Sequence, residues 1–173
     1  MVSAVLRGLA EYGALLPDGD GWRIEPHALD DVQSSRHAAA FLASRIDRFP
    51  AHTLKFLTVG AVIGKEFPFQ LAAKLAEQTP TDAFIAFKMT RQRQVLWSLA
   101  DGMNCVFVHD RLREVLIDRL SDEQIRDLHR RAAEELERDQ PNAYFDLAFH
   151  FDAAGESVRA LNYALKAAAQ ARA

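Results

Sequence analysis

AHTLKFLTVGAVI, residues 51–63, is apolar on nearly every side of a helix, and this stretch decides the fold. A helix of that kind is expected at the centre of a protein, because no face of it suits contact with water. Pro50 before it stops the preceding helix, and Gly64 after it ends the stretch. That preceding helix is predicted over residues 36–49, where one apolar stripe is formed by Ala39, Leu42, Ile46 and Phe49.

After Gly64 the sequence predicts two more helices and then a change of period. A helix over residues 68–77 has Pro68 in its first turn. A second helix runs over residues 79–92, with Thr79 as its cap. Residues 94–99 and 104–108 are β-prone and flank Asp101-Gly102, which predicts a β-hairpin.

The remainder of the chain returns to helical spacing. A helix is predicted over residues 110–120, and Ser121 with Gln124 has the spacing of a capping box for the next one. Pro141 is expected to start a further helix that Gly155 breaks, and residues 157–173 form the last helix. The apolar stripe of the helix after Ser121 comprises Ile125, Leu128, Ala132 and Leu136.

The N-terminal region predicts a helix over residues 2–11 and a small hairpin. Its strands are residues 14–16 and 22–24, on either side of the turn-forming residues 17–21. Residues 25–35 read as an irregular connection. The fold class predicted for the whole chain is therefore mainly α with two small β-hairpins.

Composition and charge exclude several classes of protein. The net charge is −3, whereas a dedicated nucleic-acid binder usually has a basic excess, so nucleic acid is an unlikely partner on this ground. Cys105 is the only cysteine, which rules out an internal disulfide and a cysteine zinc site and fits a reducing compartment. The sequence has neither a signal peptide pattern nor an apolar run of about 18 residues, so we expect a cytoplasmic protein with no membrane contact.

Two regions resemble known modules. The helices followed by a hairpin in residues 36–109 have the order of a winged-helix domain. We assign residues 36–120 to that domain. Residues 121–173 are expected to form helical hairpins. Within them, residues 141–173 resemble one tetratricopeptide repeat, with Tyr144, Leu147, Ala148, Phe151, Ala160, Ala164 and Ala167 at its large and small positions. One repeat cannot bury its own face, which predicts packing on the preceding helix and further repeats beyond it.

Most of the chain is similar to a stretch of the STAND class of signal-transduction ATPases, which are relatives of AAA+ proteins. Four segments in order carry this resemblance: LRGLAEYGALLPDGDGWRIEP (6–26), LASRIDRFPAHTLKFLTVGAVIGKEF (42–67), VFVHDRLREVLIDRLSDEQIRDLHRRAAEELE (106–137) and AFHFDAAGESVRALNYALKAAAQA (148–171). The resemblance makes residues 1–35 the end of the ATPase lid and its connection. Val95-Leu96-Trp97 departs from the family, in which a Gly-Leu-Leu-like strand is usual.

The resemblance also implies partners. The chain has no G-x-x-x-x-G-K-[ST] phosphate loop, so we expect it to be no enzyme and to hold no cofactor, with ADP or ATP bound upstream in the parent protein. It would contact the upstream ATPase domain in cis and a protein partner or ligand through the repeats. The alternative is a plain scaffold, marked by an exposed apolar patch on helices 142–154 and 157–172 that would also allow two copies to dimerise.

His109-Asp110 is the leading candidate site. The pair ends a strand and opens a helix, where free N–H groups attract anions and a histidine can donate to phosphate. The resemblance implies that His109 senses the bound diphosphate. The competing interpretation is that Asp110 caps the helix and His109 pairs with the backbone.

A second alternative is DNA binding by the winged-helix region. Lys88, Arg91 and Arg93 lie around the end of the helix that would enter the groove, although a solvated basic face is the preferred interpretation. No nucleophile–base arrangement is recognisable, so no catalytic residue is predicted. His129 and His150 are expected to be structural, and no metal site is predicted.

Overall fold

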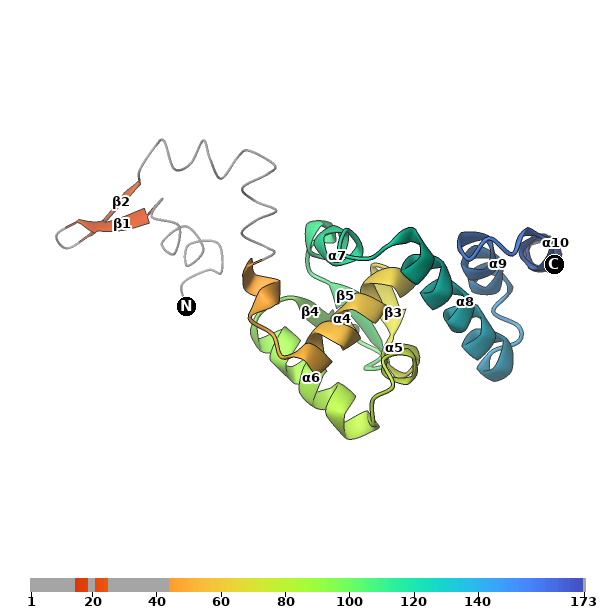
Figure 1. Cartoon of the computed structure of the whole chain (residues 1–173), viewed down its shortest axis with the longest axis horizontal. Helices are drawn as coiled ribbons and strands as arrows, with labels where there is room; N and C mark the ends of the chain where they lie inside the picture. The colour runs from red at the N-terminus through yellow and green to blue at the C-terminus, as the bar shows by residue number, and fades with distance from the viewer. Residues whose placement is uncertain (1–14, 19–20, 25–43, 173) are drawn as a thin grey trace. The chain divides into compact units, whose positions relative to one another are not determined.

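The computed structural model describes residues 15–18, 21–24 and 44–172 (Figure 1). The chain forms two compact units, Met1–Arg48 and Phe49–Ala173. The described residues are mainly helical and include two small antiparallel sheets, which confirms this part of the predicted fold class. The predicted helix at 2–11 and the connection at 25–35 lie outside the described residues.

The first unit contains the predicted N-terminal hairpin. Strands β1 (Leu15–Asp18) and β2 (Gly21–Ile24) pair antiparallel, in a register that runs from Leu15 opposite Ile24 to Asp18 opposite Gly21. The strands therefore extend into the predicted turn. Residues 44–47 are helical, as predicted for the helix over 36–49.

Helix α4 (Ala51–Ile63) is the centre of the second unit, as its apolar sequence predicts. It packs against four other helices, and most of its side chains are buried (Figure 1). Gly60 lets the next strand approach closely, because a Cβ there would lie 2.5 Å from Cζ of Phe67. The central position of α4 therefore depends on its buried apolar side chains and on the absence of a side chain at Gly60.

The second sheet has three strands, one more than the sequence predicted. Strands β4 (Leu96–Ser98) and β5 (Asn104–Phe107) form the predicted hairpin, and β3 (Glu66–Pro68) pairs with the other edge of β5. The order is β3-β5-β4. The prediction that Pro68 lies in the first turn of a helix was wrong: Pro68 ends β3, and helix α5 spans Phe69–Leu75.

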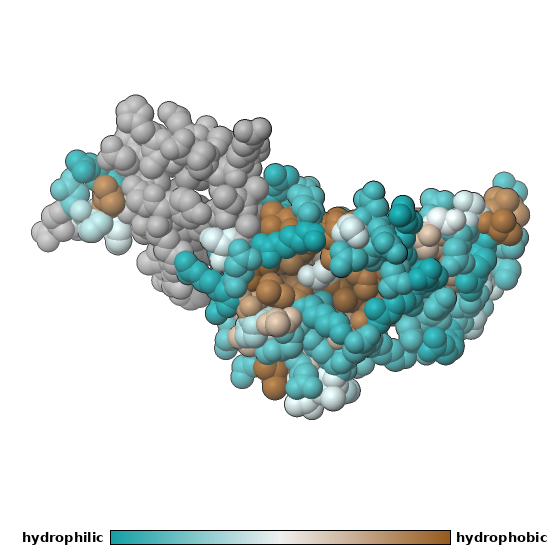
Figure 2. Space-filling model, in the orientation of Figure 1, coloured by the Kyte–Doolittle hydropathy of each residue, from teal (hydrophilic) through white to brown (hydrophobic). Residues whose placement is uncertain are grey.

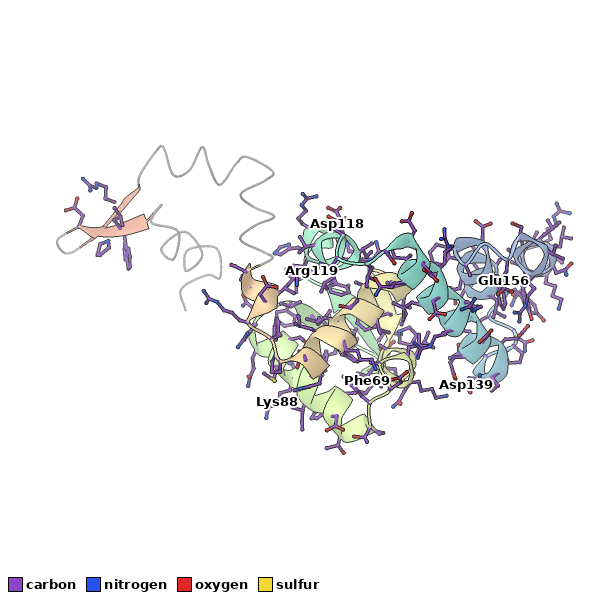
Figure 3. The ribbon with its side chains drawn as sticks, viewed as in Figure 1. Phe69, Lys88, Asp118, Arg119, Asp139 and Glu156 are labelled. Atoms are coloured by element: carbon purple, nitrogen blue, oxygen red, sulfur yellow. The ribbon has the colours of Figure 1, made fainter. Side chains whose placement is uncertain are left out.

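Aromatic rings fill the space between this sheet and the helices. Phe67 lies 6.1 Å from Phe56 of α4 and 5.6 Å from Phe107 of β5, measured between ring centroids. Phe69 continues the cluster towards Phe56 at 5.7 Å and Phe87 at 6.2 Å (Figure 3). Strands β3 and β5, which are far apart in the sequence, therefore share one aromatic core with the helices.

Helix α6 (Pro80–Gln92) begins where the sequence places it. The Thr79 side chain accepts a hydrogen bond from the Asp82 amide at 3.2 Å, so Thr79 is the predicted cap. Gln94 has a φ of 56° and turns the chain from α6 into β4. Such a left-handed conformation is uncommon for a residue with a side chain.

Helices α7 (Asp110–Ile117) and α8 (Asp122–Asp139) follow the sheet. Helix α7 ends three residues earlier than predicted. The predicted capping box is present: Gln124 N–H donates to the Ser121 hydroxyl at 3.2 Å, and Ser121 N–H donates to the Gln124 side chain at 2.9 Å. The buried face of α8 lies further along than predicted and comprises His129, Ala132, Ala133 and Leu136.

Helices α9 (Tyr144–Ala153) and α10 (Ser157–Gln170) pack on each other, and α9 packs on α8. Gly155, with a φ of +82°, provides the predicted break between them. The expectation that Pro141 starts the first of these helices was wrong. Residues 141–142 form a turn closed by a hydrogen bond from Ala143 N–H to the Gln140 carbonyl, and the helix begins after it.

Candidate functional site

His109 is the residue immediately before α7, and its side chain is exposed. Its carbonyl oxygen accepts from the Leu112 amide at 3.1 Å, while its imidazole makes no cap hydrogen bond. Asp110 is the first helical residue, and its carboxylate lies 3.0 Å from Nζ of Lys65. The imidazole is thus presented to solvent at a helix N-terminus, beside an ion pair.

The three basic residues of the DNA-binding alternative differ in their contacts. Lys88 is exposed on α6, where Figure 3 labels it. Arg91 is exposed on the same helix. Arg93, just after the helix, lies over the ring of Phe49, with its guanidinium carbon 4.6 Å from the ring centroid. One of the three cations is therefore engaged within the protein.

A groove between α9 and α10 is a largely apolar hollow on the surface of the second unit. It has a volume of about 840 Å³ and is lined by alanines together with Phe145, Phe149 and Leu161. These three large side chains are 77%, 48% and 61% exposed. Asp152 is the only charged residue in its lining. Figure 2 shows hydrophobic surface on this C-terminal helix pair.

This groove corresponds to the exposed apolar patch that the scaffold hypothesis requires on these helices. Its signal in the sequence is that α10 carries more apolar residues than one buried face can use. Of that helix only Ala160 is buried, while Val158 is 78% and Leu165 is 62% exposed. Monomeric proteins rarely leave such large side chains together in water, which makes the patch a candidate interaction surface.

Two further clefts are more polar. One, of about 660 Å³, runs along α4 and α8 and is lined by residues of both charges, including Lys55, Glu123 and Arg130. The other, of about 530 Å³, lies between β3 and α9, with Arg113 and His150 in its lining.

Sequence reasoning did not anticipate that His129 and His150 meet. They are 7% and 3% exposed, and their Nδ1 atoms lie 2.8 Å apart across the contact between α8 and α9. Phe149 contacts both rings, with centroid distances of 5.6 and 5.0 Å. No local pattern in the sequence reveals a pair that only the folded chain brings together.

Within residues 15–18, 21–24 and 44–172, no cluster of three or more His, Cys, Asp or Glu side chains could hold a metal ion. None of the helices in this part of the chain has the length and apolar character needed to cross a bilayer.

Comparison with known proteins gives no further identification. No protein-family model, no curated protein and no solved structure matches the chain significantly.

Proposed function

We propose that this chain is a relay module of a nucleotide-switched signalling protein of the STAND class. It would link a nucleotide-binding domain in the same protein to a helix pair that binds another protein. The observation that carries the proposal is the apolar groove of α9 and α10, with Phe145, Phe149 and Leu161 exposed along it. A hollow lined by large apolar side chains suits an amphipathic helix rather than a small polar ligand.

The order of elements supports a winged-helix assignment for the region within residues 36–120. One helix, α4, is followed by strand β3, two helices and the β4–β5 hairpin, with β5 between the other strands. The tetratricopeptide assignment of residues 141–173 is supported by the burial of Leu147, Phe151 and Ala160, which occupy its large and small positions. Cys105, buried and unpaired, fits the cytoplasm that the proposal implies.

Helix α8 supports the linking role because charged contacts tie it to both sides. Towards α5, Arg131 donates to the Leu75 carbonyl at 3.1 Å, and Lys74 pairs with Asp139. Figure 3 labels Asp139 at the end of α8. Towards the helix pair, Glu137 accepts from Arg159 at 2.6 Å and from the Tyr163 hydroxyl. A change in the position of α8 would therefore alter its contacts with α5 on one side and with α10 on the other.

The nucleotide part of the proposal rests on His109. An exposed imidazole at a helix N-terminus can donate to a phosphate oxygen of ADP held by a domain in cis, and the helix end favours the same negative charge. The 173-residue chain alone is expected to show no measurable ADP binding by calorimetry. In a longer form of the protein that includes the nucleotide domain, His109→Ala should weaken ADP binding roughly tenfold or more.

His52 provides the matched control, because it is also exposed and lies on another helix, α4. His52→Ala should leave the ADP dissociation constant of the longer form unchanged. Equal ADP affinity of the wild type and His109→Ala would remove the sensing role from His109.

DNA binding is the second candidate and is favoured only by the exposure of Lys88 and Arg91. It predicts duplex binding that weakens steeply with salt and is lost on replacing both residues. Because the chain has a net charge of −3 and Arg93 is engaged by Phe49, we expect no mobility shift of duplex DNA even at low salt. A salt-dependent shift lost in Lys88→Ala/Arg91→Ala would replace the relay proposal for this region.

A further inference from the structure

The cleft between strand β3 and helix α9 contains a half-buried arginine that forms no ion pair with the described residues. Arg113 of α7 lines this cleft of about 530 Å³, and its Nε donates to the Ala61 carbonyl of α4 at 2.7 Å. Two other half-buried arginines, Arg131 and Arg159, each contact a carboxylate, at 3.2 and 2.6 Å. A guanidinium has five N–H donors, so most of those of Arg113 remain available.

These remaining donors are accessible from the cleft rather than sealed in the interior. Among the residues that the structure describes, the Gln78 side-chain oxygen is the only buried side-chain N or O atom without a hydrogen-bond partner. The unused N–H groups of Arg113 are therefore open to solvent. The charge of Arg113 also acts inside the protein, because burial, followed by this charge, lowers the pKa of His129. A cation in such a partly buried position attracts an anion more strongly than it would in bulk water.

Apolar side chains form much of the remaining wall of the cleft. Phe67, Leu71 and Leu136 line it and are buried, while Phe145 and Phe149 of α9 line it and are 77% and 48% exposed. Sites for small molecules typically have this size and combine apolar walls with a few polar groups that orient the ligand. A ligand that fits should therefore combine an apolar body with one negative group.

The other charges in the lining limit the ligand to a single negative group. Lys65 already pairs with Asp110 at 3.0 Å, and Glu66 and Asp146 add two exposed carboxylates. These carboxylates would repel further negative charge, which disfavours a phosphate chain. A carboxylate carries one charge, and its two oxygens match the planar fork of the Arg113 guanidinium.

We infer that the cleft binds a small organic monocarboxylate with an apolar body, whose carboxylate contacts Arg113 and whose body lies against Phe145 and Phe149. Helix α9 packs mainly on α8 and α10, whereas Arg113 belongs to α7. The bound molecule would thus connect α9 directly to α7 and β3. This site goes beyond the relay function and depends neither on the α9–α10 groove nor on a nucleotide.

The first test compares two probes on the 173-residue chain, with binding followed by amide chemical shifts in NMR. 3-Phenylpropionate should bind saturably, with a dissociation constant on the order of 1 mM or below. The uncharged 3-phenylpropionamide has the same body and should bind at least about tenfold more weakly, because the charge-assisted contact with Arg113 is lost. Inorganic pyrophosphate should cause no saturable shift in residues of the cleft.

The second test removes the cation. Arg113→Gln should weaken binding of the acid about tenfold and leave binding of the amide unchanged, so that the preference for the acid disappears. Arg111→Gln is the matched control, because Arg111 is on the same helix, is exposed and pairs with Glu114. It should bind both probes as the wild type does. Circular dichroism checks that each variant keeps its helices.

The third test removes part of the apolar wall and needs no change at Arg113. Phe145 is largely exposed, so the fold should tolerate Phe145→Ala. This variant should bind the acid and the amide more weakly by about the same factor, roughly threefold to tenfold. Leu161→Ala is the matched control, because Leu161 lines the α9–α10 groove and is absent from the lining of the cleft. It should leave the affinity for both probes unchanged.

Equal affinity of the wild type for the acid and the amide would overturn the inference, as would acid binding that a folded Arg113→Gln variant or Phe145→Ala leaves intact. Saturable pyrophosphate binding that Arg113→Gln abolishes would reject a monocarboxylate as the ligand. If Arg113→Gln fails to fold, the comparison of the two probes on the wild type and on Phe145→Ala decides. None of these results bears on ADP binding through His109, so the cleft and the relay function can fail separately.

Discussion

His129 of α8 and His150 of α9 are hydrogen-bonded to each other through their Nδ1 atoms, 2.8 Å apart in a buried contact. One ring must donate and the other must accept, so the pair holds one proton between the two nitrogens. Burial, followed by the neighbouring His129, lowers the pKa of His150 to about 4. Burial, followed by the charge of Arg113, also lowers the pKa of His129. The contact between α8 and α9 therefore depends on the histidines remaining uncharged.

The pair predicts that acid destabilises the protein. Below pH 6.5 the unfolded chain gains protons on these histidines while the folded chain resists them, so the free energy of unfolding falls until the pH nears 4. The contribution lost by His150 is up to about 3 kcal/mol, from one pKa unit being worth 1.36 kcal/mol. Urea unfolding at several pH values between 4 and 8 measures it.

Replacing both histidines by phenylalanine should flatten this pH dependence, because phenylalanine fills similar space and cannot titrate. His52→Gln, at an exposed position, should leave the pH dependence of the wild type in place. An equally steep fall in the His129→Phe/His150→Phe variant would show that other groups are responsible.

Gly60→Ala should destabilise the protein even though alanine favours a helix. The substitution gains up to about 1 kcal/mol in helix propensity. The new Cβ would lie 2.5 Å from Cζ of Phe67, a fully buried ring that packs against Phe56 and Phe107. Overpacking of this kind typically costs about 1–3 kcal/mol, so we expect a net loss measurable by urea unfolding.

Combining Gly60→Ala with Phe67→Leu tests that explanation. The smaller side chain relieves the clash, so the two changes together should cost less than the sum of their separate effects. Strict additivity would mean that the cost of Gly60→Ala arises elsewhere.

Phe151 and Phe145 form a matched pair on α9, since one is fully buried and the other is 77% exposed. Phe151 packs against Tyr163 at 5.7 Å and lies under the guanidinium of Arg159 at 3.8 Å. Phe151→Ala should lower the free energy of unfolding by about 3–5 kcal/mol. Phe145→Ala should change it by about 0.5 kcal/mol or less. Similar losses in the two variants would contradict the placement of α9.

Cys105 should be inert to thiol reagents in the folded protein. It is 2% exposed on β5, and burial raises the pKa of its thiol to about 12. Because only the thiolate reacts, an aromatic disulfide reagent at pH 8 should label the native chain far more slowly than the chain in denaturant. Rapid labelling without denaturant would show that β5 opens readily.

Features that depend on residues close together in the chain could be predicted from the sequence. The caps at Thr79 and Ser121 and the break at Gly155 each depend on residues a few positions apart. The second hairpin followed from β-prone runs around Asp101-Gly102. Asp101 indeed closes that turn by accepting hydrogen bonds from the Met103 and Asn104 amides, at 2.9 and 3.1 Å.

Features that depend on distant contacts could not be predicted in this way. Strand β3 has only three residues and ends in a proline, so no period reveals it, and it is recognisable only from its pairing with β5. The start of α9 was misplaced because Pro141 suits a turn as well as the first turn of a helix. The apolar patch was named from the sequence only as the mark of the scaffold alternative, and the histidine pair was missed because it depends on the packing of two helices.

Helix α8 has a mechanical consequence for the whole arrangement. Its 18 residues make a rod of about 27 Å between the end of α7 and the α9–α10 helix pair. A tilt of about 10° at its capped start would carry its far end through roughly 5 Å, close to the pitch of one helical turn. Because α9 packs on α8 and the groove is lined by residues of α9, α10 and Ala171, such a tilt would carry the whole groove with it as a unit.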